Sequence, residues 1–364
     1  MKIAIDFREG ANPFRAGKGE YVYQLVQAWF NQYPDDEVIL LVEAGQTPSL
    51  SFGKWRLKVV PAKGLWWHLW VWLWLEFTRP VNVYFSTTSL IVPALVRSVK
   101  TVTTLFDFTV WRFPTTHFPK AVMVEKIFMG WAIRFSNHLL AISEFTKQEA
   151  IQLFRTAVDK ITVTPLGVDP HFQPMSPSPT AIRSLQEKYQ LPENFILYLG
   201  TLEPRKNIAR LIEAFQTIRL QHPDTYLVLA GAKGWSDDIL PSPPPPQIVV
   251  TGYIDDHDRP TLYNLATMFV FPSLYEGFGM PPLEAMACGV PVITAAVASL
   301  PEVVGESAVL INPTDTRQLA QSINKLLGNK DLRIQLRQQG LAQAKQFTWE
   351  ATLAHTRQAI YNYD

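Results

Sequence analysis

Short apolar runs alternate with longer stretches of helical periodicity along most of this chain of 364 residues. The apolar runs of the first half lie at residues 2–7, 38–42, 83–85, 101–105, 138–141 and 161–164, and those of the second half at 195–199, 226–230, 248–250, 268–271 and 292–294. Helical patterns such as residues 21–30 and 122–135 lie between them. This alternation is typical of parallel sheets built from βαβ units. It predicts an α/β fold with two Rossmann-like parallel-sheet domains that face a cleft.

The length and one proline-rich segment predict the domain division. A chain of this size exceeds what one hydrophobic core usually supports. Residues 173–180 contain Pro174, Pro177 and Pro179 without a helical or strand pattern, which indicates a linker. We expect an N-terminal domain at residues 1–173 and a C-terminal domain at 174–347. A final helix is expected at 348–364, with Thr348 as its N-cap.

Charge and cysteine content exclude some classes of protein. Lys and Arg total 33 against 32 for Asp and Glu, so nothing suggests nucleic acid as the main partner. The only cysteine, Cys288, excludes an internal disulfide and fits a reducing compartment. The longest apolar run, residues 65–77, would rise about 20 Å as a helix, short of the roughly 30 Å hydrocarbon core. With Met1 leading directly into a strand, we expect a cytoplasmic protein that does not span the membrane.

The most informative segment is residues 271–291. A strand ends at Phe271, Gly277 and Gly279 permit a sharp turn, and a helix is expected to open near residues 281–282, where proline suits the first turn. Free backbone N–H groups at such a helix start favour anions, and open α/β sheets bind ligands at this edge. Glu276 and Glu284 can accept hydrogen bonds from sugar and ribose hydroxyls. The alternative interpretation is a capped helix with ordinary glutamates.

This segment resembles the E-x7-E signature of retaining glycosyltransferases of the GT-B architecture, family 4 (group 1). Residues 197–208, 165–169 and 299–305 resemble further motifs of that family in the same order. The resemblance implies two Rossmann-like domains, the N-terminal one on the acceptor side. It also implies that a hexose moves from a nucleotide sugar to an acceptor with retention of anomeric configuration. No cofactor and no metal are expected.

The resemblance also implies roles for individual residues. Glu276 matches the carboxylate that contacts the donor hexose, and Glu284 the one that binds ribose. Arg205 and Lys206 match a basic loop that faces the diphosphate, although Thr201 stands where some relatives have a further arginine. The remaining donor-binding residues implied are Gly277, Phe278, Gly279 and Met280 beside the sugar and distal phosphate, Tyr253 and Ile254 at the base, and Gly17 and Gly19 in a glycine-rich loop of the first domain.

One position departs from the family. Many relatives carry His-Asp at the end of the strand at residues 101–105, and here the pair is Phe106-Asp107. A phenyl ring cannot make the hydrogen bond of a histidine, and His117 is one candidate to replace it. Asp107 is kept as a site residue. The departure leaves open a second hypothesis, a catalytically weakened protein that binds sugar nucleotides.

A third hypothesis, an NAD-dependent oxidoreductase, rests only on the Rossmann-like halves. It requires a third glycine after Gly17 and Gly19, and that position is Val22. Asp256 and Asp258 imitate a metal-binding DxD motif, but we interpret them as an ordinary polar loop.

The basic loop resembles that of mannosyltransferases, so GDP-mannose is the favoured donor and UDP-glucose the next. The acceptor is expected to be a glycan or a lipid-linked sugar. Five tryptophans at residues 66–74 surround a helix, which favours burial. The alternative is that they dock on a membrane, which would make this a peripheral protein of the cytoplasmic face.

Overall fold

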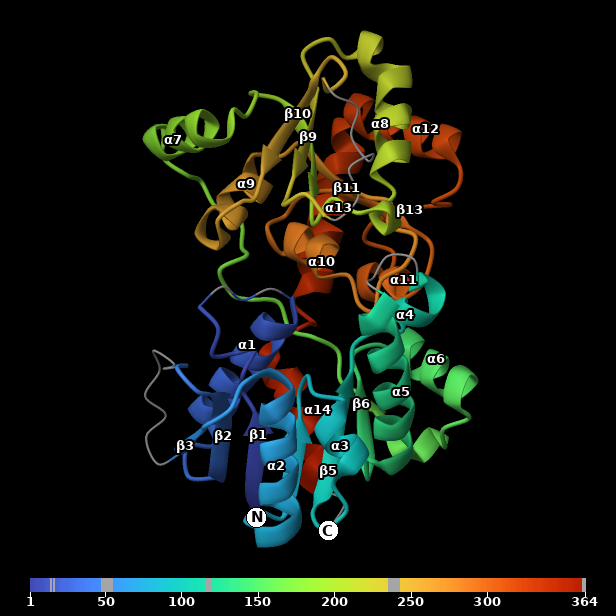
Figure 1. Ribbon diagram of the computed structural model, residues 1–364. Coiled ribbons are helices and arrows are strands. Elements are labelled where there is room, and N and C mark those ends of the chain that lie inside the picture. The colour runs from blue at the N-terminus through green and yellow to red at the C-terminus, as the bar shows by residue number, and fades with distance from the viewer. Residues whose placement is uncertain (14, 16, 47–54, 115–118, 235–242, 362–364) are drawn as a thin grey trace. The chain divides into compact units, whose positions relative to one another are not determined.

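The computed structural model describes residues 1–361 apart from 14, 16, 47–54, 115–118 and 235–242. The chain forms two compact units (Figure 1). Unit 1 consists of residues 1–167 together with 348–364, and unit 2 of residues 168–347. The proline-rich segment 173–180, predicted as the linker, therefore belongs to unit 2.

Unit 1 is built on a seven-stranded parallel sheet of order β3-β2-β1-β4-β5-β6-β7. Its strands are β1 (Lys2–Asp6), β2 (Glu37–Glu43), β3 (Arg56–Val60), β4 (Val83–Ser86), β5 (Lys100–Leu105), β6 (His138–Ala141) and β7 (Ile161–Val163). The sequence prediction missed β3. This strand lies at the edge of the sheet, where Leu57 and Val59 are half exposed, so it lacks the continuous apolar run of a central strand.

Helices cover both faces of this sheet. They are α1 (Gly17–Gln32), α2 (Gly64–Thr78), α3 (Ile91–Leu95), α4 (Thr109–Arg112), α5 (Pro119–Phe135), α6 (Glu144–Phe154) and α14 (Trp349–Tyr361). The direction in which strands are added reverses between β3 and β4, so right-handed connections put α1 and α2 on opposite faces. The C-terminal helix α14 packs against α1, while α3 contacts both α2 and α5 (Figure 1).

The start of α14 shows how the chain returns to unit 1. Thr348 Oγ1 accepts a hydrogen bond from the Ala351 N–H (3.2 Å), which confirms the predicted N-cap. Gly167 lies directly against this start, because a Cβ there would come within 2.3 Å of Trp349 N. Only glycine allows the two backbone segments to approach so closely.

Unit 2 is built on a six-stranded parallel sheet of order β10-β9-β8-β11-β12-β13. Its strands are β8 (Phe195–Leu199), β9 (Tyr226–Ala230), β10 (Ile248–Gly252), β11 (Met268–Phe271), β12 (Val292–Ala295) and β13 (Val309–Ile311). Its helices are α7 (Pro179–Tyr189), α8 (Ile208–Ile218), α9 (Arg259–Leu265), α10 (Met280–Ala287), α11 (Leu300–Val304), α12 (Thr316–Gly328) and α13 (Lys330–Ala344). The predicted fold of two parallel α/β sheets is confirmed, although β13 was also missed.

The strand orders locate the ligand-binding edge of each unit. The order reverses between β1 and β4 in unit 1 and between β8 and β11 in unit 2. In open α/β sheets, ligands bind outside the carboxyl ends of the strands at such a switch point. Within the described part of the chain, no helix combines the length and the apolar character needed to cross a bilayer.

Candidate functional site

Two loops of unit 2 meet at the switch point between β8 and β11. The loop after β8 forms a short 3-10 turn, η3 (Pro204–Lys206), and the loop after β11 carries Glu276. Lys206 Nζ lies 2.7 Å from Glu276 Oε1, and Arg205 Nη1 lies 3.2 Å from Glu276 Oε2. Arg205 Nη2 also lies 2.5 Å from Glu203 Oε1. The structure thus joins three of the predicted site residues in one ionic cluster, which we call the β8–β11 cluster (Glu203, Arg205, Lys206 and Glu276).

The cluster is buried and its charges balance. Glu276 is 9% exposed. Burial alone raises the pKa of Glu276, but Lys206 and Arg205 outweigh it, so that its pKa lies below the ordinary value. The side chain is therefore a carboxylate at neutral pH, able only to accept hydrogen bonds. Such a group suits the hydroxyls of a sugar.

The backbone after Glu276 is shaped by Gly279. This residue has φ 116°, and a Cβ there would come within 2.8 Å of Leu300 Cδ2. Helix α10 starts directly after it at Met280, slightly before the predicted start. The first turn of α10 offers few N–H groups at this edge, because residues 281 and 282 are prolines and the Leu283 N–H donates to the carbonyl oxygen of Gly279 (3.4 Å).

Ser299 holds this turn in place through hydrogen bonds to its backbone. Its Oγ lies 2.8 Å from the carbonyl oxygen of Glu276 and 2.7 Å from that of Phe278, so its hydroxyl hydrogen can be donated to either. The sequence prediction gave Ser299 no role. The only signal was its position at the start of the third family motif.

Glu284 lies in α10 and is held by two partners that the sequence analysis missed. Arg259 Nη2 lies 2.6 Å from Glu284 Oε1 and 2.5 Å from Oε2, and the Tyr263 hydroxyl donates to Oε2 at 2.8 Å. Burial raises the pKa of Tyr263 well above its usual value and Glu284 raises it further, so Tyr263 remains a neutral donor. These contacts orient the carboxylate that the resemblance assigns to ribose.

Tyr253 and Ile254 follow β10 at the edge of the sheet. β9 and β8 lie between them and the switch point. Tyr253 is 58% exposed, whereas Ile254 is buried. Their assignment to the nucleotide base stays a prediction.

The predicted site residues of unit 1 differ from expectation. Gly17 and Gly19 lie in the first turn of α1, so the prediction that they belong to a loop before the helix was wrong. Glycine is tolerated here because its cost applies to the interior of a helix, whereas the N–H groups of the first turn have no partner within the helix. Asp107 Oδ1 accepts a hydrogen bond from the Thr109 N–H (2.9 Å) at the start of α4. The Phe106 ring packs edge-on against Tyr21, with centroids 5.2 Å apart, and His117 lies outside the described residues.

A buried polar cluster at the switch point of unit 1 escaped the sequence analysis. Arg8 Nε and Nη2 each lie 2.9 Å from a carboxylate oxygen of Asp6, at the carboxyl end of β1. His68 Nδ1 lies 3.0 Å from Ser89 Oγ, which follows β4. Burial, together with the charge of Arg8, lowers the pKa of His68 to about 4. The position of Asp6 at the end of the first strand was the available signal.

The acidic loop beside α9 brings ligand atoms of Asp255, His257 and Asp258 within 4.8 Å of one another. Lys188 Nζ lies 2.6 Å from Asp255 Oδ2 and 2.7 Å from Asp258 Oδ2. One ammonium group therefore already pairs with both carboxylates, and its positive charge disfavours a metal ion at the same position. The interpretation as a polar loop stays a prediction.

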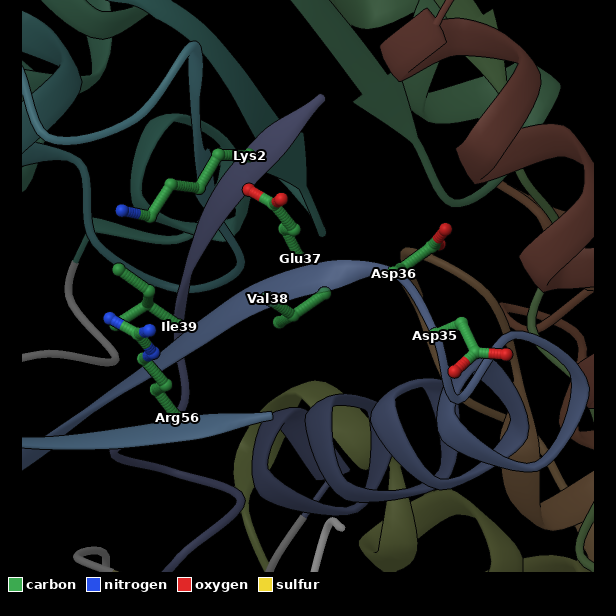
Figure 2. A pocket seen from close by; sticks show the side chains of 7 residues that line it. All are labelled: Lys2, Asp35, Asp36, Glu37, Val38, Ile39 and Arg56. Atoms are coloured by element: carbon green, nitrogen blue, oxygen red, sulfur yellow. The ribbon is translucent and has the colours of Figure 1, made fainter. Parts of the chain in front are cut away.

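A cavity of about 330 Å³ lies in unit 1 away from these groups (Figure 2). It is lined by Lys2, Asp35, Asp36, Glu37, Val38, Ile39 and Arg56. These residues surround the amino ends of β1 and β2, opposite the edge where α/β sheets bind ligands. We therefore do not assign the cavity to the reaction.

Two parallel α/β units of this kind are the fold of the GT-B glycosyltransferases. A family profile described as "Glycosyl transferases group 1" matches residues 182–343. The O-antigen chain mannosyltransferase B of Escherichia coli is 38% identical over 267 residues, which cover 71% of this chain and 70% of that protein. The chain belongs to the glycosyl transferases group 1.

Two further proteins are similar to this chain. The serotype-specific mannosyltransferase WbdA of Escherichia coli is 36% identical over 236 residues, which cover 60% of this chain and 28% of WbdA. The structure of Anabaena Alr3699/HepE in complex with UDP and glucose matches with a TM-score of 0.75 at 21% identity, covering 99% of this chain and all of that one. The first match adds a second mannosyltransferase as a relative, and the second confirms the fold.

Proposed function

We propose that this glycosyltransferase moves a mannosyl group from GDP-mannose to a hydroxyl of a glycan or lipid-linked acceptor, with retention of anomeric configuration. Two relatives named mannosyltransferases support the choice of sugar. The observation that carries the proposal is the buried, ionised Glu276 held by Lys206 and Arg205 at the switch point of unit 2.

In the proposed step, the bond between C1 of mannose and the diphosphate oxygen breaks. The acceptor oxygen forms its bond to C1 on the same face, and its proton passes to an oxygen of the departing diphosphate. GDP leaves with that proton and the electron pair of the broken bond. The step needs no metal ion and no cofactor.

Glu276 would accept hydrogen bonds from the mannose hydroxyls and so orient C1. Lys206 and Arg205 would stabilise the charge that grows on the diphosphate, an effect that is largest in the transition state. Arg205 and Lys206 already form ion pairs with Glu203 and Glu276. When the donor binds, the Lys206 ammonium group would therefore keep its contact with Glu276 and form a second one with a phosphate oxygen.

Calorimetric titration with GDP, UDP and ADP tests the donor. We expect GDP to bind most tightly, and purified protein to hydrolyse GDP-mannose slowly in the presence of a chelator. Tighter binding of UDP would replace the donor by UDP-glucose. Complete dependence on a divalent ion would contradict the metal-free step. An NMR spectrum of the transfer product that shows the anomeric configuration opposite to that of the donor would contradict retention.

Phe106 motivates one competing function, a weakened protein that binds sugar nucleotides without turning them over. The two alternatives differ in one result. GDP binding without hydrolysis of GDP-mannose, and without transfer to any mannose-containing acceptor, would favour the weakened protein. Restoring a histidine by Phe106→His should then increase hydrolysis.

A further inference from the structure

Helix α2 is apolar on both of its sides. Trp67 and Leu75 are fully buried against the sheet. Trp66, Leu73 and Phe77 lie on the outward side and are 71%, 40% and 76% exposed. A surface helix ordinarily carries charged and polar residues on its outward side. In α2 that side presents aromatic and aliphatic side chains to water.

Helix α5 carries a second row of exposed apolar side chains. Met123, Ile127 and Trp131 recur at intervals of one helical turn and are 58%, 45% and 50% exposed. Helix α3 contacts both α2 and α5, and the three helices lie next to one another on one side of the sheet (Figure 1). We call the exposed side chains Trp66, Leu73, Phe77, Met123, Ile127 and Trp131 the α2–α5 surface. Large exposed apolar side chains gathered in this number on one side of a unit mark an interaction site.

Cations lie among and around these side chains. Lys58 Nζ lies 5.1 Å and 4.8 Å from the ring centroids of Trp70 and Trp74, which stack on each other along α2. Arg97 Cζ lies 3.7 Å from the centroid of the Phe135 ring at the end of α5. Arg and Lys side chains packed in this way cover apolar surface with their stems and hold the charge at its rim.

The positive charge is a local feature. The chain as a whole is nearly balanced, with Lys+Arg 33 and Asp+Glu 32. Basic residues of the helices and their flanks include Lys58, Arg79, Arg97, Lys126 and Arg134, whereas α2 and α5 contain the acids Glu76 and Glu125. Glu76 Oε2 is already an acceptor for the backbone N–H groups of Arg97 (2.9 Å) and Ser98 (3.2 Å). The partner of this surface should therefore be apolar with a negatively charged boundary.

A membrane surface has this chemistry. We propose that the α2–α5 surface docks unit 1 onto a lipid bilayer that contains anionic lipids. Tryptophan favours the boundary between hydrocarbon and headgroups, and Lys and Arg reach lipid phosphates from there. Helix α2, with 15 residues, rises about 22 Å and is too short to span the hydrocarbon core. A second copy of the chain is disfavoured as the partner, because a two-fold contact would bring like charges together.

This inference goes beyond the proposed transfer reaction. Only the purpose of membrane docking rests on the proposed function. If the acceptor is lipid-linked, docking brings the enzyme to an acceptor that stays in the bilayer. Membrane binding itself requires neither the donor nor catalysis.

Sedimentation with vesicles tests the proposal on the chain of 364 residues. One set of vesicles is phosphatidylcholine alone, and the other also contains phosphatidylglycerol. The test variant is Trp66→Gln with Phe77→Gln, two exposed positions that tolerate polar residues. Its matched control is Leu220→Gln, at a position of unit 2 that is 80% exposed. Arg134→Glu tests the charge, and Lys345→Glu in unit 2 is its control.

We expect the wild-type protein to bind the phosphatidylglycerol vesicles more strongly than phosphatidylcholine alone, and to release them as salt increases. Trp66→Gln with Phe77→Gln should lower the partition coefficient about tenfold or more, and Arg134→Glu several-fold. Both controls should bind like the wild type.

Absence of wild-type binding to both kinds of vesicle, or full binding by the double variant, would overturn the proposal. So would a wild-type dimer that the same double variant converts to a monomer, because the surface would then be a protein interface. GDP titration of each variant is run in parallel. Since the β8–β11 cluster lies in unit 2, a failure of membrane docking leaves the transferase proposal standing.

Discussion

At the scale of single residues, Glu276 is the most sensitive test of the proposed reaction. Glu276→Gln retains the size of the side chain but removes the charge that Lys206 and Arg205 neutralise. The amide also replaces one acceptor by a donor facing Lys206. We expect turnover of GDP-mannose to fall about 10²- to 10³-fold, as when one group that stabilises a transition state is lost. Initial-rate kinetics at saturating donor measures this.

The matched control for this change is Glu284→Gln. If Glu284 binds ribose, its loss should mainly raise the KM for the donor, because ribose contacts are similar in the ground and transition states. Unchanged turnover in Glu276→Gln would remove Glu276 from the reaction. Glu276→Ala is a poorer test, since it leaves the buried Lys206 ammonium group without its carboxylate and should destabilise unit 2 by about 3–5 kcal/mol.

A substitution of Lys206 tests phosphate binding independently of sugar binding. Lys206→Met keeps the apolar stem but removes the ammonium group, which is buried beside Glu276. If Lys206 contacts the diphosphate, the affinity for free GDP should fall about ten- to a hundred-fold, the loss expected for a charge-assisted hydrogen bond. Calorimetry with GDP and with guanosine distinguishes the cause. An equal loss for both ligands would indicate a distorted site instead of a lost phosphate contact.

At the scale of elements, the sequence predicted those parts of unit 2 in which a strand or helix pattern adjoins a glycine that permits a turn. The strand ending at Phe271, the turn at Gly279 and Glu284 within the following helix are all found. Gly279 could be predicted because its backbone conformation needs glycine. Lys206 and Glu276 could be paired in advance only through the resemblance, since 70 positions separate them in the chain.

What the sequence did not predict depends on tertiary contacts. β3 and β13 are short edge strands whose residues are partly exposed, so their apolar runs are weak. Ser299 and Arg259 act through partners on other elements, and nothing in their local sequence reveals that partner. The prediction that the tryptophans of residues 66–74 are buried was right for Trp67 and wrong for Trp66, because only one side of α2 meets the sheet.

The polar cluster of β1, α2 and β4 predicts a pH-dependent stability of unit 1. The pKa of His68 in the folded chain, about 4, lies below its ordinary value of 6.5. Between these pH values the unfolded chain binds a proton that the folded chain excludes, so the free energy of unfolding should fall as the pH decreases from about 6.5 to about 4. The full loss is about 3 kcal/mol. Urea denaturation at several pH values measures it.

His68→Asn is the control for this effect, because an amide can still pair with Ser89 Oγ without titrating. The variant should lose stability less steeply over the same interval. The free energy of unfolding of this variant should still fall somewhat with decreasing pH because of His138, whose pKa is also lowered to about 4, mainly by burial. An identical pH slope in wild type and His68→Asn would assign the whole dependence to other groups.

At the scale of the whole molecule, the chain leaves unit 1 after Gly167 and returns to it at Thr348. The profile match at residues 182–343 lies entirely within unit 2, so the family signal is concentrated in the unit that holds the β8–β11 cluster. The matched chain of Anabaena Alr3699/HepE extends the similarity of fold over both units. The two proposals therefore concern different units, because the β8–β11 cluster of the proposed reaction lies in unit 2 and the α2–α5 surface of the proposed membrane docking lies in unit 1.

This division predicts that the C-terminal helix stabilises unit 1 and not the unit that immediately precedes it in sequence. Leu353 of α14 is fully buried, and α14 packs on α1. Leu353→Ala should cost about 2–5 kcal/mol through lost burial and the cavity left behind. Hydrogen exchange should then show faster exchange in the strands of unit 1, with unit 2 protected as in the wild type and GDP affinity unchanged. The converse variant, Leu319→Ala in α12, removes an equally buried leucine of unit 2 and should reverse the pattern. If Leu353→Ala weakened both units equally, the two would unfold as one cooperative structure, because a defect confined to one unit would then be transmitted to the other.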